Sequence, residues 1–404
     1  SGAARWASIV DPVFSDTDGD AFLEPGESVD VTVTLRNELG RLADAVVVVT
    51  TAPAAFSPDI ITDSARIGVV EKGEVRTLTK VFRIGLPEDM PYDGELRLMV
   101  WVYDGTTFAG RQLVTATVNP TYRTISANDI TTTINSIGNI GFNDYPSNSQ
   151  GVGLRYRNGP NMLFEGGLML GVQPRDLPNV VRAGDGDRKD TSFHIGTIAE
   201  VRSDSVPSGI RVQTRYSDVY DPWGVGVQVR QQVYAPTDDS VRSTLVVALD
   251  VTNRVDTTIR DLYVSEFFDV DIGPAGANNG CAWDGRRGIG FVKNTRDASL
   301  PTFGVAMVSP LPVNFFAVDN DGDGLTSPNI YDDFLRAEKW YMMSRGIART
   351  NSRITDVSTV IGAGPFSLAP QETRQIVFVI GVGMSYDEIA NAISAARSSA
   401  ASLG

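Results

Sequence analysis

The feature that most constrains the fold is the strict alternation of apolar and polar side chains in residues 28–37, SVDVTVTLRN. Val29, Val31, Val33 and Leu35 share one side of an extended chain, which is the two-residue period of a strand buried on one face. Further short strand-like runs, separated by Pro-Gly, Lys-Gly and Asp-Gly turn pairs, span residues 6–10, 44–51, 65–70, 74–84, 94–105 and 107–120. About seven strands in ~110 residues predict a seven-stranded immunoglobulin-like sandwich over residues 1–119.

A second all-β domain is predicted over residues 120–404. Pro120, in the segment VNPTY, marks the boundary because proline cannot continue a central strand. The strand-like runs that follow are more numerous and their loops are longer, which favours one larger antiparallel β-sandwich. Examples are residues 151–157, 162–172, 225–235, 242–253, 261–273, 303–309, 356–362 and 373–383.

Two short helices are expected within this second domain. Residues 331–345 precede Gly346, a residue type that commonly follows a helix. Residues 386–402 follow Ser385, which forms a capping-box pattern with Glu388. The second helix carries one apolar stripe, which is typical of a helix that covers a sheet, although a partner interface also fits.

The composition excludes several classes of protein. A net charge of −14 and an isoelectric point near 4.6 argue against partners such as nucleic acid or an anionic membrane surface, which require a basic footprint. No apolar run approaches the ~20 residues that span a bilayer. With one cysteine, Cys281, and one histidine, His194, a zinc site built from several such residues is excluded. The strand-like run around His194 favours a structural histidine over a catalytic one.

The stretch DTDGDAFLEPGE, residues 16–27, resembles a calcium-binding loop. Asp16, Asp18 and Asp20 occupy positions 1, 3 and 5, Glu24 occupies position 9, and Glu27 occupies position 12. The loop lacks the glycine expected at position 6 and flanking helices, so an acidic turn is the alternative. Calcium is the cofactor that this pattern predicts, in a stabilising role.

A second acidic loop, DNDGDGLTSPNIYDD, follows a later strand-like run. Asp319, Asp321 and Asp323 match positions 1, 3 and 5 of the calcium template, but the final carboxylate is missing. Asp332 or Asp333 is expected to supply it from the first turn of the following helix. Several carboxylates held together without a cation repel one another, which favours a metal ion here.

A possible ligand site is expected around residues 269–284. Asp269 and Asp271 lie on the same face of one strand, and a loop follows with Asn279, Trp283 and Asp284. Paired carboxylates serve glycoside hydrolysis, but they also bind cations or fix loops, and these roles are favoured. Trp283 with Asn279 and Asp284 is the best candidate sugar platform, against the alternative of a ring that covers the core.

Two groups of motifs resemble families of secreted bacterial proteins. Residues 16–39, DTDGDAFLEPGESVDVTVTLRNEL, resemble the opening of CARDB-like, immunoglobulin-type modules. The later motifs MLFEGGLMLG, FFDVDIGP and DNDGDG, with residues 332–340 and 362–397, resemble the non-catalytic C-terminal region of secreted subtilisin-like peptidases of Bacteroidetes/Chlorobi-type bacteria. The resemblance implies export and an extracellular or cell-surface setting. Serine and histidine motifs of a subtilisin domain are absent from the sequence, and the start at SGAAR without methionine is expected of a processed chain.

Three functions remain open on the sequence alone. The first is a non-catalytic extracellular structural protein that assembles with copies of itself into a filament, tube or sheath, with calcium-stabilised loops. The second is an accessory module that binds polysaccharide or protein for a secreted peptidase or another hydrolase. The third is a hydrolase that uses carboxylates such as Asp269 and Asp271. The sequence favours them in that order.

Overall fold

The computed structural model describes residues 4–19, 22–184, 188–205, 208–274 and 276–400. The fold is mostly β, with 56% of residues in strands and 6% in helices. The chain divides into two compact units, Ser1–Thr121 and Tyr122–Gly404, where the sequence placed a boundary after residue 119. None of the helices in the described ranges is long and apolar enough to cross a membrane.

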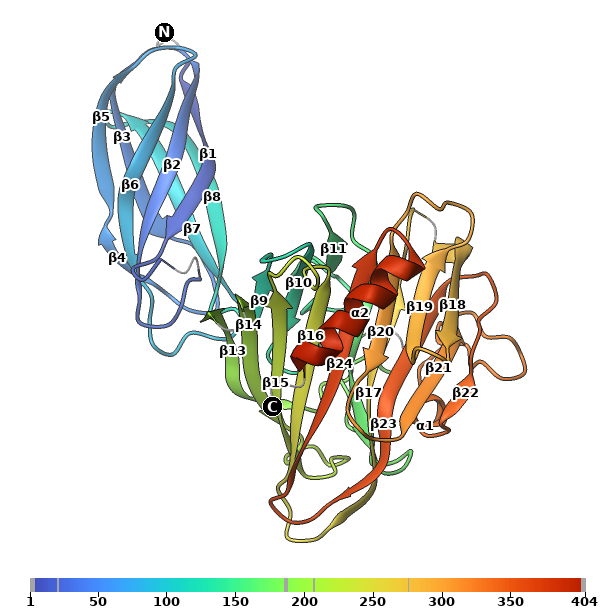
Figure 1. The fold of residues 1–404 in the computed structure, drawn as a ribbon. Helices are drawn as coiled ribbons and strands as arrows, with labels where there is room; N and C mark the ends of the chain where they lie inside the picture. Colours follow the sequence, from blue (N-terminus) through green and yellow to red (C-terminus); the bar gives the residue numbers. More distant parts are fainter. Residues whose placement is uncertain (1–3, 20–21, 185–187, 206–207, 275, 401–404) are drawn as a thin grey trace. The chain divides into compact units, whose positions relative to one another are not determined.

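The first unit is a sandwich of two four-stranded antiparallel sheets (Figure 1). One sheet has the order β1-β2-β6-β4, with β1 at Trp6–Ser15, β2 at Ser28–Leu39, β6 at Val75–Gly85 and β4 at Asp59–Thr62. The other has the order β5-β3-β7-β8, with β5 at Ser64–Val70, β3 at Leu42–Thr51, β7 at Gly94–Asp104 and β8 at Thr107–Val118. The prediction of seven strands missed β4, because its four residues are too short for alternation to show.

The core of the first unit forms as the alternating pattern predicts. Val29, Val31, Val33 and Leu35 of β2 are fully buried between the sheets. The sheet β5-β3-β7-β8 also carries apolar side chains on its outer face, where cross-strand neighbours include Val46 with Tyr103 and Tyr103 with Phe108. Arg111 lies on the same face, over the Trp101 ring.

The second unit is built around two larger sheets. The eight-stranded antiparallel sheet has the order β13-β14-β15-β16-β24-β20-β19-β18. Its strands are β13 His194–Ser205, β14 Ser208–Ser217, β15 Val227–Pro236, β16 Thr244–Asn253, β24 Thr373–Gly383, β20 Thr302–Met307, β19 Ile289–Asn294 and β18 Asn279–Asp284. A short 3₁₀ helix, η1 (Gly276–Asn278), precedes β18.

The five-stranded sheet has the order β12-β17-β23-β21-β22, and only β21 and β22 pair in parallel. Its strands are β12 Leu163–Gly171, β17 Ile259–Val270, β23 Val357–Leu368, β21 Val313–Asp319 and β22 Ile347–Arg349. A three-stranded sheet of β11 (Leu154–Tyr156), β10 (Ile130–Asn135) and β9 (Tyr122–Ile125) completes the unit. Buried side chains from all three sheets form one continuous core, which includes Val247, Phe268 and Phe378.

The two helices cover the outer faces of the two larger sheets. Helix α2 (Tyr386–Ala400) packs Ile393 and Ala396 on β24 and its neighbours, in red across the sheet in Figure 1. Ser385 Oγ accepts from the Glu388 N–H, as the capping box predicts. Helix α1 (Arg336–Met343) packs Met342 and Met343 on the five-stranded sheet. It begins at Arg336 rather than at the predicted residue 331, and the preceding turn takes another course.

Candidate functional site

One end of the five-stranded sheet brings polar side chains into a row on its outer face. The strand register places Glu165 of β12 opposite Asp269 of β17, and Asp269 opposite Ser358 of β23. Asp271 comes just after β17 and Asp356 just before β23, so both lie at the same end. The antiparallel pairing therefore collects four carboxylates from three strands that are far apart in the sequence.

One buried arginine pairs with two of the acidic side chains in this row. Arg182 Nε lies 2.7 Å from Glu165 Oε2, and its Nη2 pairs with Asp269. Burial alone lowers the pKa of Arg182, but the charges of Asp269 and Glu165 outweigh it and raise the pKa. Because removal of one partner leaves a buried charge uncompensated, this triad holds the loop that carries Arg182 in place.

Helix α1 supports the same loop through a second buried cation. Lys339 is fully buried and its Nζ donates to Arg182 O at 2.7 Å. It also donates to Asn179 Oδ1 and Asp190 Oδ2, each at 3.0 Å. Burial lowers the pKa of Lys339, although the negative charge of Asp190 acts to raise it. The two buried cations, Arg182 and Lys339, are thus each paired with at least one carboxylate.

Beside the triad lies a hollow of about 270 Å³, here called the acidic pocket. Its lining combines aromatic rings with charged groups: Tyr145, Phe164, Arg182, Asp269, Asp271, Ile330, Tyr331 and Asp356. Phe164 is 37% exposed and Tyr331 is 53% exposed, so both rings are accessible. Exposed rings beside convergent polar groups are typical of a ligand site.

Two carboxylates of the acidic pocket, Asp271 and Asp356, form no ion pair with any of the described residues. Burial, followed by repulsion from Asp269 and Asp356, raises the pKa of Asp271 to about 7. Burial and the charge of Asp269 also raise the pKa of Asp356, which accepts hydrogen bonds from Asn320 Nδ2 at 3.0 Å and from the Tyr331 hydroxyl. Asp271 therefore lines the pocket as a carboxyl group that is partly protonated near pH 7 and fully charged only at higher pH.

A glycine lets the two carboxylates approach the 3₁₀ helix η1. A Cβ atom on Gly276 would lie 2.4 Å from Asp271 Oδ1 and 3.3 Å from Asp356 Oδ1. The shorter distance is below any real Cβ contact, so a larger residue would push into this corner of the pocket. The two carboxylates thus border the same small space.

Asp269 is an anchor rather than a reactive group. Its Oδ1 accepts from Asn320 Nδ2 at 2.8 Å and from Ser358 Oγ at 3.0 Å, while its Oδ2 accepts from Arg182. Both oxygens are thus saturated and the residue is only 4% exposed. This arrangement leaves Asp271 and Asp356 as the carboxylates that can meet a ligand.

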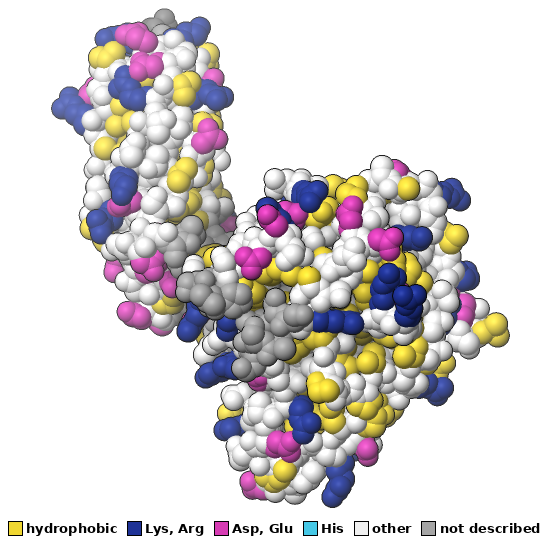
Figure 2. All heavy atoms as spheres, in the orientation of Figure 1, with side chains coloured by type: hydrophobic (Ala, Val, Ile, Leu, Met, Phe, Trp, Pro, Cys, Tyr) yellow, Lys and Arg dark blue, Asp and Glu magenta, His cyan; other side chains and the backbone are white. Residues whose placement is uncertain are grey.

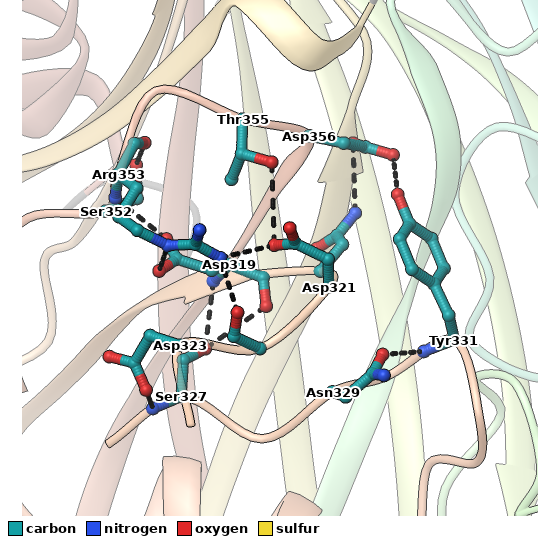
Figure 3. Close-up of polar contacts among 12 residues, drawn as sticks. Asp319, Asp321, Asp323, Ser327, Asn329, Tyr331, Ser352, Arg353, Thr355 and Asp356 are labelled. Carbon is teal, nitrogen blue, oxygen red and sulfur yellow. Dashed lines mark hydrogen bonds and ion pairs between the residues drawn. The ribbon is translucent and has the colours of Figure 1, made fainter. Parts of the chain in front are cut away.

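The second predicted calcium loop folds around two arginines, Arg349 and Arg353, and Figure 3 shows Arg353 with Asp319 and Asp321. Fully buried Asp319 pairs with Arg349 at 2.6 Å and with Arg353 at 2.9 Å. Arg353 also pairs with Asp321 at 2.6 Å, and Arg349 lies 3.3 Å from Asp323. The guanidinium groups therefore supply the positive charge that the sequence analysis assigned to a metal ion.

The remaining predicted ligands of that loop, Asp332 and Asp333, do not complete a set of metal ligands. Asp332 and Asp333 lie in the turn before α1, because the helix begins at Arg336 instead of residue 331. Within the described ranges, no three His, Cys, Asp or Glu side chains gather in an arrangement that could hold a metal ion. Calcium at this loop stays a prediction.

The first predicted calcium loop connects β1 to β2. Asp16 Oδ1 accepts from the Gly19 N–H at 2.9 Å, whereas its Oδ2 is enclosed without a partner. Burial raises the pKa of Glu27, and the charges of Asp18, Asp16 and Glu24 raise it further. Predicted ligand Asp20 lies outside the described residues.

The predicted sugar platform around Trp283 is packed into the fold instead. Trp283 stacks on Phe315 with ring centroids 4.7 Å apart and packs against the main core. Asn279 is fully buried. A hydrogen bond from the Tyr386 hydroxyl lowers the pKa of Asp284 to about 2. The core-covering alternative therefore describes Trp283, and the structure does not bring this trio to the acidic pocket.

The single histidine lies far from any constellation of catalytic type. His194 begins the edge strand β13 and is exposed, with its ring edge-on to Tyr220 at 5.5 Å. Cys281 is buried in β18, and burial raises the pKa of its thiol to about 12. Neither side chain is placed to act as a base or nucleophile in the acidic pocket.

Comparisons with known proteins add only distant likeness. No family model matches the sequence, and no curated protein matches it. Bacterial glucoamylase in complex with acarbose is 8% identical, with a TM-score of 0.39 over 67% of this chain and 32% of that one. Heparan sulfate lyase HepC from Pedobacter heparinus is 7% identical, with a TM-score of 0.27 over 48% and 24%. Slr1438 protein from Synechocystis sp. PCC 6803 is 9% identical, with a TM-score of 0.34 over 65% and 96%.

Proposed function

We propose that the chain is a non-catalytic extracellular protein whose larger unit binds a carbohydrate in the acidic pocket. The observation that carries this proposal is the Asp271 carboxylate, which faces a hollow shared with the exposed rings of Phe164 and Tyr331. The extracellular setting rests on the resemblance to secreted bacterial proteins. The function corresponds to the accessory binding module among the three functions expected from the sequence.

The chemistry of the pocket suits a ligand with many hydroxyl groups. Sugar hydroxyls donate hydrogen bonds to carboxylate oxygens, and bonds to charged acceptors are stronger than those between neutral groups. The apolar face of a sugar ring packs on an exposed aromatic ring and removes both from water. Asp271, Phe164 and Tyr331 supply both elements within one small hollow.

Calorimetric titration with a panel of neutral oligosaccharides tests the proposal. We expect saturable binding that weakens about tenfold or more in Asp271→Ala, because a hydrogen bond to a charged group is lost. Tyr331→Ala and Gly276→Val should weaken it too, whereas Tyr220→Ala, which removes another exposed ring, should not. Absence of binding across the panel, or equal binding by all variants, would refute the proposal.

Self-assembly is a second candidate, supported by the first unit. On the outer face of the sheet β5-β3-β7-β8, Phe108 is 47% exposed and contacts the rings of Trp6, Trp101 and Tyr103 edge-on. Val46 extends this apolar surface on β3. A second copy of the chain would shield such a face from water, as expected of a filament, tube or sheath subunit.

Electron microscopy and sedimentation velocity test self-assembly. We expect concentration-dependent oligomers of the wild-type chain and monomers of Phe108→Glu. Tyr92→Glu, another exposed aromatic position in the same unit, is the matched control and should assemble normally. A wild-type chain that remains monomeric at high concentration would exclude this function.

We propose calcium binding at the first predicted calcium loop only. Burial raises the pKa of Glu27 there, and the charges of Asp18, Asp16 and Glu24 raise it further, although no three carboxylates of the described residues are arranged to hold a metal ion. A divalent cation would relieve this repulsion and stiffen the connection between β1 and β2. Its role would be structural.

A further inference from the structure

We propose that the larger unit carries a second binding site, for an oxyanion such as a sulfate, phosphate or carboxylate group. A hollow of about 250 Å³, here called the arginine pocket, lies between the β18–β19 turn and helix α2. Its polar lining is Arg286, Arg287, Asn391, Ser394 and Arg397. Figure 2 shows Lys and Arg side chains gathered beside α2 on this face of the unit.

The positive charges in the arginine pocket exceed the negative charges around them. Arg287 pairs with Asp284 at 3.4 Å and lies 4.0 Å from Asp387. In the described part of the chain, Arg286 and Arg397 have no carboxylate within ion-pair distance. Because the whole chain has a net charge of −14, an uncompensated arginine cluster is a local exception that attracts anions.

The backbone holds Arg397 in a fixed position. Its Nη2 donates to Arg287 O at 2.7 Å and to Gly288 O at 3.3 Å. These two bonds use Nη2 only, so Nη1 of the guanidinium group remains as a donor for a ligand. A side chain held in advance loses less entropy when a ligand binds.

Helix α2 supplies neutral donors on the same side. Asn391, Ser394 and Arg397 are spaced three residues apart, which places them along one face of the helix. A guanidinium group presents a planar fork that matches two oxygens of a sulfate, phosphate or carboxylate group. The amide of Asn391 and the hydroxyl of Ser394 add donors for the remaining oxygens.

The site is independent of the acidic pocket and of the function proposed for it. The two hollows share no lining residue, and they belong to different sheets. An acidic ligand is repelled by Asp271 and Asp356 but attracted by Arg286 and Arg397. The arginine pocket therefore selects a negatively charged group, whatever the acidic pocket binds.

Calorimetric titration with sodium sulfate, phosphate and acetate, against chloride at equal ionic strength, tests this inference. We expect saturable binding of at least one oxyanion by the wild-type chain. Sulfate and phosphate without acetate would identify a tetrahedral ester group, and acetate as well would include carboxylates such as uronic acids. Binding indistinguishable from chloride would overturn the inference.

Variants locate the binding. Arg286→Gln and Arg397→Gln should each weaken it about tenfold, because each removes a charged donor. Ser394→Asp places a carboxylate at an exposed position of the same hollow and should abolish binding without disturbing the contacts of Arg397. Arg202→Gln, an exposed arginine on β13 that pairs with Glu200, is the control. Equal affinity in Ser394→Asp and the wild type would also overturn the inference.

Discussion

A buried glutamate makes the stability of the larger unit depend on pH. Glu266 lies in β17 and is fully buried. Neither of its carboxyl oxygens has a hydrogen-bond partner. Burial raises its pKa from 4.5 to about 8, so the folded chain keeps this group protonated at neutral pH. The unfolded chain releases the proton.

The size of the effect follows from this difference in proton binding. Between pH 4.5 and pH 8 the folded state binds one proton more than the unfolded state, so the free energy of unfolding falls as pH rises. The slope is about 1.4 kcal/mol per pH unit, which gives about 3 kcal/mol between pH 5 and pH 7. Below the unfolded pKa the two states are equally protonated and the cost disappears.

Glu266→Gln removes the cost while it keeps the shape of the side chain. We expect this variant to be more stable than the wild type by about 3 kcal/mol at pH 7, with a much smaller difference at pH 5. In urea unfolding followed by circular dichroism, the midpoint should rise by about 1 M, for an m-value near 3 kcal/mol/M. Glu200→Gln, at an exposed position, is the control. A constant difference between Glu266→Gln and the wild type from pH 5 to pH 7 would refute the reasoning.

Three further outcomes are expected. Arg182→Gln should destabilise the larger unit by about 3–5 kcal/mol in urea unfolding, because Glu165 and Asp269 lose their counter-charge; a loss below about 1 kcal/mol would contradict the described triad. Cys281 should react with a coloured thiol reagent only on unfolding, since it is buried with a pKa raised to about 12, and fast reaction of the folded chain would disprove this. Calcium at 100 times its Kd should stabilise the first unit by about 2.7 kcal/mol, and Asp16→Asn should remove this stabilisation. A rise in the melting temperature of the larger unit alone would instead place the metal at the second predicted calcium loop.

Local patterns predicted the strands of the first unit well because they register burial on one face, whereas β14, β19 and β21 of the larger unit were not among the predicted runs. Val29 to Leu35 alternate in the sequence and point into the core as expected. The same logic missed β4, whose four residues, Asp59–Thr62, are too few to show a period. Helix α1 begins five residues after the predicted residue 331. Tyr331 instead donates a hydrogen bond to Asp356, and a helical pattern in the sequence does not predict such a tertiary contact.

The candidate site was only half predictable for the same reason. Asp269 and Asp271 stand out in the sequence as alternating carboxylates. Their partners come from distant segments: Arg182 is 87 positions from Asp269, and Asp356 and Tyr331 belong to separate loops. Nothing in their local sequence marks them. Arginine within the apolar run NVVRAG was the one available signal, since a buried arginine requires a carboxylate partner.

The place of β24 in the eight-stranded sheet has a consequence for how the chain folds. This strand, Thr373–Gly383, pairs with β16 on one side and β20 on the other, although it is the last strand of the sequence. The centre of the sheet therefore stays open until Thr373–Gly383 has been synthesised. The first unit makes its own pairings and folds early, whereas the larger unit must wait for residue 383, and a premature stop before β24 would leave two unpaired strand edges and an aggregation-prone intermediate.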